Sequence, residues 1–137
     1  MGEGSNGGQV SVMCLRSYPD ELLDKYGFVI PASDVENGYL DLAGAVEKPG
    51  VEAAPSHLGL VGRYLFTPEV FSILEKTDPG YGGEIQLTDA IHELGKRGRL
   101  RGFVADAELL DTGTPQGLLQ ASKVLGSHQF GPEVFDT

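Results

Sequence analysis

The feature that most constrains the fold is a strand pattern that passes directly into a helix start. Residues 58–66 (LGLVGRYLF) alternate in the way typical of a strand, and Thr67, Pro68 and Glu69 follow at once. These three supply a hydroxyl cap, a proline at the first helical position and an early acid. We therefore predict a helix over about residues 68–76. Its inner face would consist of Val70, Phe71 and Leu74.

Similar patterns recur along the whole chain. Strands are predicted over residues 9–15, 26–30, 39–47, 58–66, 101–104 and 108–110. Helices or helical turns are predicted over residues 19–24, 68–76, 85–94 and 115–126, the last capped by Thr114 and stopped at Gly126. A loop is expected over residues 49–56. Strands mixed with capped helices indicate an α/β fold. Since the strands are short and good helices few, we expect part of a larger sheet, with an unpaired edge that favours self-association.

Composition limits the classes of partner. Twenty acidic against ten basic residues give a formal charge of −10, which argues against nucleic acid or an anionic membrane as a partner. The basic run at residues 96–99 is therefore expected to be a helix end and a solvated turn. One cysteine, Cys14, sits in an apolar run, as expected for a reduced thiol in a cytoplasmic protein. No apolar run approaches the roughly 20 residues that span a bilayer.

The segment GAVEKPG, residues 44–50, places an acid and a base side by side where a strand ends. One interpretation is a solvated strand end closed by a turn. Neighbouring residues on a regular strand point to opposite faces, so Glu47 and Lys48 can serve one ligand only if the backbone bends there. Pro49 should hold Lys48 in the extended region and stop the strand, and Gly50 permits an unusual turn.

Asp111 is the other notable charged group. It follows the strand predicted over residues 108–110 and opens the run DTGTP, so it could reach a metal from a strand end. It could also merely cap the turn that follows, and the spacing alone favours this second interpretation. Motifs for a zinc site, a P-loop or a serine nucleophile are absent from the sequence, and the three histidines are widely separated.

Five sequence motifs together resemble one enzyme family. The motifs are YG at residues 26–27, VEKP at 46–49, VGRY at 61–64, GGEIQLTDA at 82–90 and LDTG at 110–113. Their wording and spacing are similar to the sugar-phosphate nucleotidyltransferases, and within them to the bacterial UTP:glucose-1-phosphate uridylyltransferases. The resemblance covers roughly residues 10–122. It implies a mixed, mostly parallel Rossmann-like sheet flanked by helices, and transfer of UMP from UTP to glucose-1-phosphate, giving UDP-glucose and pyrophosphate.

The resemblance also implies roles for individual residues. Glu47 would accept hydrogen bonds from glucose hydroxyls, and Lys48 would contact the sugar phosphate. Gly27 would present its backbone to the sugar, and the backbone around Leu60 to Gly62 would line the same pocket. Asp111 would be one of two carboxylates on Mg²⁺. The partners implied are glucose-1-phosphate, UTP and UDP-glucose, in a cytoplasmic homo-oligomer.

The sequence departs from the family pattern in one respect. Family members begin with a glycine-rich phosphate loop and later supply a second metal-binding aspartate, and residues 1–137 contain neither. We therefore expect a flexible leader at residues 1–9, the sugar-phosphate-binding C-terminal half of the domain at residues 10–126, and a tail at residues 127–137. Such a chain would be inactive alone. A pyrophosphorylase for another sugar or base, and a non-catalytic assembly or regulatory module, remain alternatives.

Overall fold

The computed structural model describes residues 8–136 and divides into two compact units, Met1–Asp106 and Ala107–Thr137. Most of the predicted leader, residues 1–7, lies outside the described residues. Each unit is described by itself. No helix among the described residues is both long and apolar enough to cross a membrane.

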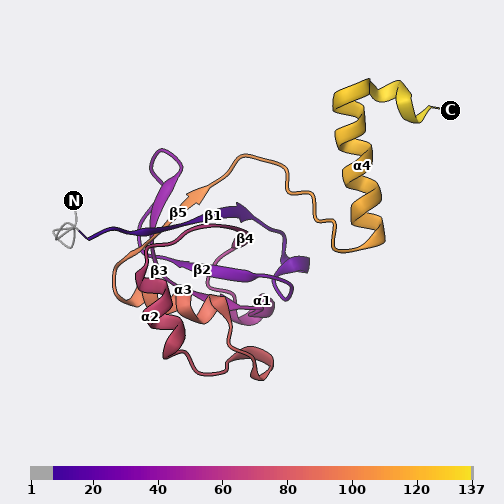
Figure 1. Ribbon diagram of the computed structural model, residues 1–137. Coiled ribbons are helices and arrows are strands. Elements are labelled where there is room, and N and C mark those ends of the chain that lie inside the picture. The colour runs from indigo at the N-terminus through magenta and orange to yellow at the C-terminus, as the bar shows by residue number, and fades with distance from the viewer. Residues whose placement is uncertain (1–7, 137) are drawn as a thin grey trace. The chain divides into compact units, whose positions relative to one another are not determined.

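The first unit combines a small sheet with helices that lie between its strands in the chain (Figure 1). The strands are β1 (Ser11–Ser17), β2 (Gly27–Pro31), β3 (Tyr39–Glu47), β4 (Leu58–Leu65) and β5 (Leu100–Val104). The helices are α1 (Gly50–Ala53), α2 (Glu69–Glu75) and α3 (Leu87–Lys96), with short 3₁₀ turns η1 (Asp20–Leu22) and η2 (Tyr81–Gly83). Five of the six predicted strands are confirmed, and the loop predicted over residues 49–56 contains the short helix α1.

The strands close on one another in the order β1-β4-β2-β3-β5, with β5 returning to β1. Only β1 and β5 run parallel; the other four pairings are antiparallel. The sheet is therefore mixed, as predicted, but the mostly parallel character is wrong for the described strands. The predicted unpaired edge is also wrong, because each of these five strands has a neighbour on both sides. Antiparallel neighbours need only short connections, and the turn at residues 36–38 is one.

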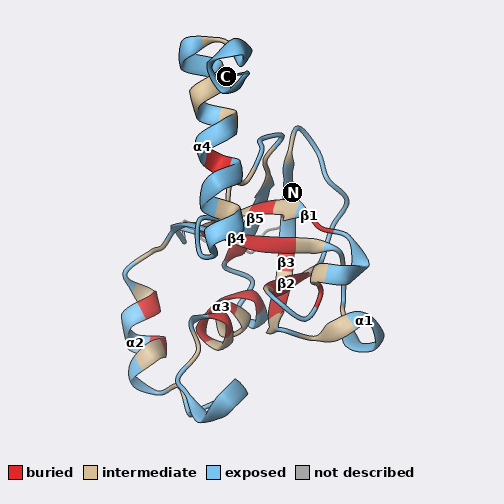
Figure 2. Ribbon diagram, turned by 90° about the vertical axis from the view of Figure 1, so that its right-hand side faces the viewer, coloured by how far each residue is buried: buried red, intermediate tan, exposed pale blue. Residues whose placement is uncertain are grey.

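The core lies between the sheet and α3. Its buried side chains are Met13, Leu15, Val29, Leu40, Leu42, Ala45, Leu60, Val70, Ile73, Ala90, Ile91, Leu94 and Leu100. Figure 2 shows the buried positions gathered on the strands and on α3. Gly95 allows the close approach: a Cβ there would lie 2.4 Å from the backbone nitrogen of Gly44 in β3. Of the four apolar positions whose spacing predicts the helix α3, Ala90, Ile91 and Leu94 are buried as expected, but Leu87 is 36% exposed.

Two local predictions around β4 and α2 need correction. In α2, Val70 is buried as expected, but Phe71 is 69% exposed and Ile73 takes the inward position. In β4, the strict alternation predicted over residues 58–66 fails because the pairing with β1 shifts register between Met13 and Leu15. Gly62, with φ of +81°, lies in the shifted stretch, and a residue in the left-handed region breaks the alternation of a strand.

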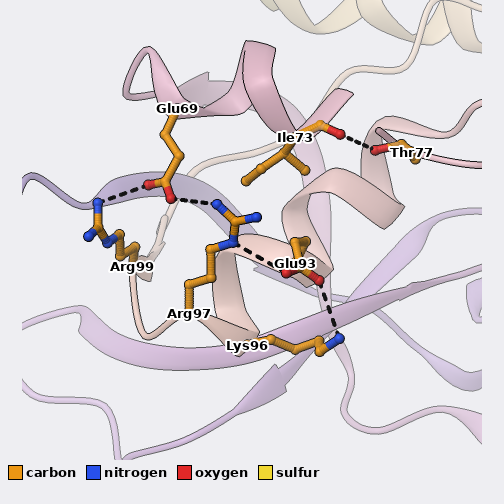
Figure 3. A network of polar contacts seen from close by, with 7 residues as sticks. All are labelled: Glu69, Ile73, Thr77, Glu93, Lys96, Arg97 and Arg99. Atoms are coloured by element: carbon orange, nitrogen blue, oxygen red, sulfur yellow. Dashed lines mark hydrogen bonds and ion pairs between the residues drawn. The ribbon is translucent and has the colours of Figure 1, made fainter. Parts of the chain in front are cut away.

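Ion pairs connect α2 to the C-terminal end of α3 (Figure 3). Arg97 donates to Glu69 at 2.8 Å and to Glu93 at 3.2 Å, and Arg99 donates to the second oxygen of Glu69 at 3.2 Å. Lys96 lies 3.3 Å from Glu93. The hydrogen bonds from Arg97 and Lys96 lower the pKa of Glu93, and those to Glu69 and Glu93 raise the pKa of Arg97. The basic run at residues 96–99 is thus a paired helix end and turn, as predicted.

The second unit is built around one helix, α4 (Pro115–Phe130), followed by the 3₁₀ turn η3 (Pro132–Phe135). Thr114 caps α4 as predicted, accepting a hydrogen bond from the Gly117 N–H at 3.0 Å. Two predictions here are wrong. Residues 108–110 do not form a strand, and α4 continues through Gly126 to Phe130, with Gly131 as its C-cap at a φ of +91°.

Candidate functional site

Glu47 and Gly27 face each other at the ends of two antiparallel strands. Glu47 is the last residue of β3, and its Cα partner is Gly27, the first residue of β2. Gly27 is buried, and a Cβ there would lie 3.0 Å from Leu60 and 3.1 Å from the hydroxyl of Thr88. Three residues singled out from the sequence, Gly27, Glu47 and Leu60, are therefore close together, and a side chain at Gly27 would crowd them.

Thr88 joins the group from α3. Its hydroxyl donates a short hydrogen bond to Oε2 of Glu47, although the two residues are far apart in the sequence. Thr88 is only 5% exposed, so this hydrogen bond gives a buried hydroxyl its partner and also holds the carboxylate in place. The motif GGEIQLTDA contributes to the family resemblance, but the sequence predicted no role for Thr88. The only available signal was a hydroxyl in the first turn of a helix, and such residues are usually taken as caps.

The backbone turns sharply at Lys48. Its φ is +44°, in the left-handed region, so Pro49 does not hold Lys48 extended as predicted. The turn is fixed by two backbone hydrogen bonds, from Lys48 N–H to the Tyr26 carbonyl at 3.0 Å and from Gly50 N–H to the Leu23 carbonyl at 2.9 Å. Gly50, with φ of +73°, provides the unusual turn that was expected. The bend required for Glu47 and Lys48 to serve one ligand is therefore present.

The charged end of Lys48 lies over an aromatic ring. Its Nζ is 5.2 Å from the ring centroid of Tyr81, a distance at which a cation is attracted to the ring face. Tyr81 belongs to the loop that ends in the motif GGEIQLTDA, and its carbonyl accepts a hydrogen bond from the Gln86 side chain at 3.0 Å. Sequence reasoning did not identify Tyr81.

The remaining predicted residue of this unit, Gly62, lies on the turn within β4. Within the described residues, nothing lies within 4 Å of the position that its Cβ would occupy, so the backbone there is open. Tyr64, two residues on, has a raised pKa, chiefly because its hydroxyl is partly buried and also because Glu47 is negatively charged nearby.

Asp111 belongs to the second unit and has a different setting. It is exposed, and its Oδ1 accepts a hydrogen bond from the Gly113 N–H at 2.9 Å, so the turn-capping interpretation is observed. Residues 8–136 contain no cluster of three or more His, Cys, Asp or Glu side chains that could hold a metal. Asp111 thus offers one carboxylate, and the described chain alone does not complete a metal site.

Comparison with known proteins gives consistent matches. The sequence pattern of the family described as nucleotidyl transferase matches residues 4–128. A UTP–glucose-1-phosphate uridylyltransferase of Pseudomonas aeruginosa is 39% identical over 105 residues, which are 77% of this chain and 37% of that protein. The chain therefore spans well under half the length of this curated relative.

Two solved structures share the fold. The structure of a UDP-glucose pyrophosphorylase complexed with UDP-glucose has a TM-score of 0.81 at 34% identity, covering 87% of this chain and 45% of that one. A UTP-bound enzyme of the same kind from Acinetobacter baumannii has a TM-score of 0.76 at 35% identity, covering 94% and 45%. With the family pattern matched over most of its residues, this chain belongs to the nucleotidyl transferase family.

Proposed function

We propose that this chain forms the sugar-phosphate side of an enzyme that makes UDP-glucose and pyrophosphate from UTP and glucose-1-phosphate. The observation that carries the proposal is the bent strand end at Glu47 and Lys48, with Gly27 opposite it. An acceptor carboxylate and a cation on adjacent residues suit a ligand that carries hydroxyls at one end and a phosphate at the other. The names of the matched relatives support the same substrates.

In this proposal each residue has a distinct task. Glu47 accepts hydrogen bonds from glucose hydroxyls, and Lys48 neutralises the sugar phosphate as a compact cation. Gly27 leaves room for the sugar, because a Cβ there would crowd Leu60 and Thr88. The open backbone at Gly62 contributes to the wall of the same pocket.

The reaction needs little covalent chemistry from these residues. An oxygen of the sugar phosphate attacks the α-phosphorus of UTP in line, the bond to the β-phosphate oxygen breaks, and pyrophosphate leaves. Because the attacking oxygen is already anionic, no general base is required. Lys48 and Glu47 would act by holding the sugar phosphate in the attacking position, and Lys48 would also reduce the repulsion between the phosphates.

A divalent metal, which we propose is Mg²⁺, would neutralise phosphate charge when bound. Mg²⁺ commonly takes one or two protein carboxylates and completes its shell with water and substrate phosphates. The carboxylate of Asp111 has a suitable chemical character, and one of its oxygens is already used by Gly113. The other ligands would have to come from outside the described residues.

The nucleotide side of the site is proposed to lie in the part of the relatives that this chain does not match. The mostly parallel strands expected of the family would lie in that part. We further propose that the complete protein is a cytoplasmic homo-oligomer of carbohydrate metabolism. The exposed apolar residues of α4, among them Leu119 at 72% and Phe130 at 64%, support association with further protein surface.

The test compares residues 1–137 with a complete enzyme that carries this segment together with the remaining part of the family's domain. With UTP, glucose-1-phosphate and Mg²⁺, the complete enzyme should form UDP-glucose, while residues 1–137 alone should show no turnover. In the complete enzyme, Glu47→Gln should raise the KM for glucose-1-phosphate and change the KM for UTP little. Turnover by residues 1–137 at about 1 s⁻¹ or more, a rate ordinary for enzymes, would disprove the division of the site.

A further inference from the structure

The Thr88 hydroxyl is a buried polar group that forms a hydrogen bond with one particular partner. It lies in the first turn of α3, yet α3 takes no side-chain cap from the residue before it, and the hydroxyl is directed instead to Glu47 of β3. Within the described residues, Glu47 has no other side-chain hydrogen bond. The interaction engages Oε2 and leaves Oε1 without a side-chain hydrogen bond among the described residues.

A glutamate at the end of a strand would otherwise be free to rotate. Glu47 is half-buried, it has three side-chain torsions, and the strand ends at this residue. Ordering such a side chain only when a ligand arrives costs binding free energy, on the order of 0.5–1.5 kcal/mol for a side chain with many rotamers. A buried hydroxyl that holds one carboxylate oxygen beforehand removes part of that cost.

The surroundings of Thr88 keep its hydroxyl in place. Thr88 is held by the packing of α3 on the core, where Ala90, Ile91 and Leu94 are fully buried. Its methyl group and hydroxyl also lie 3.3 and 3.1 Å from the position of a Cβ on Gly27, so α3 and β2 meet at this point. Because α3 is fixed by its packing on the core, Thr88 in turn fixes the position of the carboxylate at the end of β3.

We propose that Thr88 is the positioning residue for Glu47: it fixes the carboxylate so that Oε1 is presented to the hydroxyls of the sugar phosphate. Thr88 itself touches no substrate in this proposal. The inference rests on the proposed function in its choice of ligand, but the link between Thr88 and Glu47 can be judged without any ligand.

The binding test uses the 137-residue chain and two probes, glucose-1-phosphate and inorganic phosphate, titrated by NMR. Thr88→Val keeps the shape and removes the hydroxyl, and should raise the Kd for glucose-1-phosphate by about tenfold, as expected for a hydrogen bond to a charged group. The Kd for inorganic phosphate, which has no sugar hydroxyls, should not change. Thr88→Ser keeps the hydroxyl and should bind glucose-1-phosphate within about threefold of the unmodified chain.

Thr77→Val is the matched control. It removes a threonine hydroxyl that donates to the Ile73 carbonyl at 2.7 Å after α2, and it should leave both Kd values unchanged. The proposal is overturned if Thr88→Val binds glucose-1-phosphate as tightly as the unmodified chain. It is also overturned if this variant weakens both probes equally, because that result would indicate a general structural role.

A crystal structure supplies the readout that needs no ligand. In Thr88→Val, or in Thr88→Ala if the valine variant does not fold, the Glu47 carboxylate should leave its position or occupy several rotamers. An unchanged carboxylate would overturn the positioning role. If the unmodified chain binds no glucose-1-phosphate while the carboxylate still moves in the variant, the proposed substrate is wrong and the role of Thr88 stands.

Discussion

Glu47 and Asp111 are both carboxylates proposed for the same reaction, but the chain supports them in opposite ways. Glu47 is fixed by contacts between distant segments: its strand pairs with Gly27, and α3 supplies the Thr88 hydroxyl. Asp111 is held by a local turn, through the Gly113 N–H two residues away. In the proposed enzyme, the sugar side of the site would therefore be organised within this chain, whereas the metal side would need further groups.

The largest effect is expected on the sugar side of the proposed site. Lys48→Ala in the complete enzyme removes the cation that neutralises the sugar phosphate, so kcat/KM should fall by roughly 10², about 3 kcal/mol. Lys76→Ala, at the exposed C-terminal end of α2, is the control and should leave kcat/KM unchanged. Steady-state kinetics with both substrates varied would measure the change. A loss below about twofold would remove Lys48 from the site.

Asp111→Asn sharpens the comparison because it separates the turn from the charge. Asparagine can still accept the Gly113 hydrogen bond through its side-chain oxygen, so the turn should persist while the negative charge is lost. We expect activity of the complete enzyme to fall by at least about tenfold and the Mg²⁺ concentration for half-maximal rate to rise. The exposed Asp106→Asn serves as the control for charge alone. If both quantities matched the unmodified enzyme, Asp111 would only cap its turn.

A smaller effect is expected from the ring beneath Lys48. Tyr81→Leu removes the aromatic face and keeps an apolar side chain, so Lys48 loses about 0.5–1 kcal/mol of attraction at this exposed position. The KM for glucose-1-phosphate should rise by about two- to fivefold, and Tyr81→Phe should behave like the unmodified enzyme. Equal KM values for the leucine and phenylalanine variants would show that the ring does not place Lys48.

The patterning of the sequence predicted what depends on neighbouring residues, whereas Gly27 and Leu60 were assigned to the site of Glu47 only through the family resemblance. Residues 39–47 match β3 from end to end, because apolar patterning and the turn at Asn37–Gly38 define that strand locally. The contact of Thr88 with Glu47 could not be predicted, since it requires α3 to be placed against β3. Errors at single residues have local causes. Around the helix, Phe71 lies about 100° to one side of the buried Val70 and Ile73 about 60° to the other, so a modest error in the direction of the buried face exchanges the inner residue.

The same contrast explains the ends of the second unit. Gly126 was expected to stop α4, but the Phe135 ring of η3 lies 2.8 Å from where a Cβ on Gly126 would be, so the glycine serves close packing within the helix. The strand predicted over residues 108–110 has three residues and no partner segment in the described part of its unit. An apolar run of that length does not specify a strand without a neighbouring strand to pair with.

The smallest effect concerns the ion pairs that connect α2 and α3. It tests whether these ion pairs or the hydrophobic core stabilise the first unit. Arg97 and Lys96 lower the pKa of Glu93, so Glu93 contributes stability that is present above the ordinary glutamate pKa of about 4.3 and is lost as pH falls through its lowered value. Glu93→Gln should therefore lower the melting temperature by about 1–3 °C at pH 7 and hardly at all at about pH 3.

Glu75→Gln, at the exposed end of α2, is the control. Since exposed pairs contribute little and salt screens them, 1 M NaCl should also remove most of the difference. A difference that persisted at pH 3 would show that Glu93 stabilises the unit through packing instead of charge.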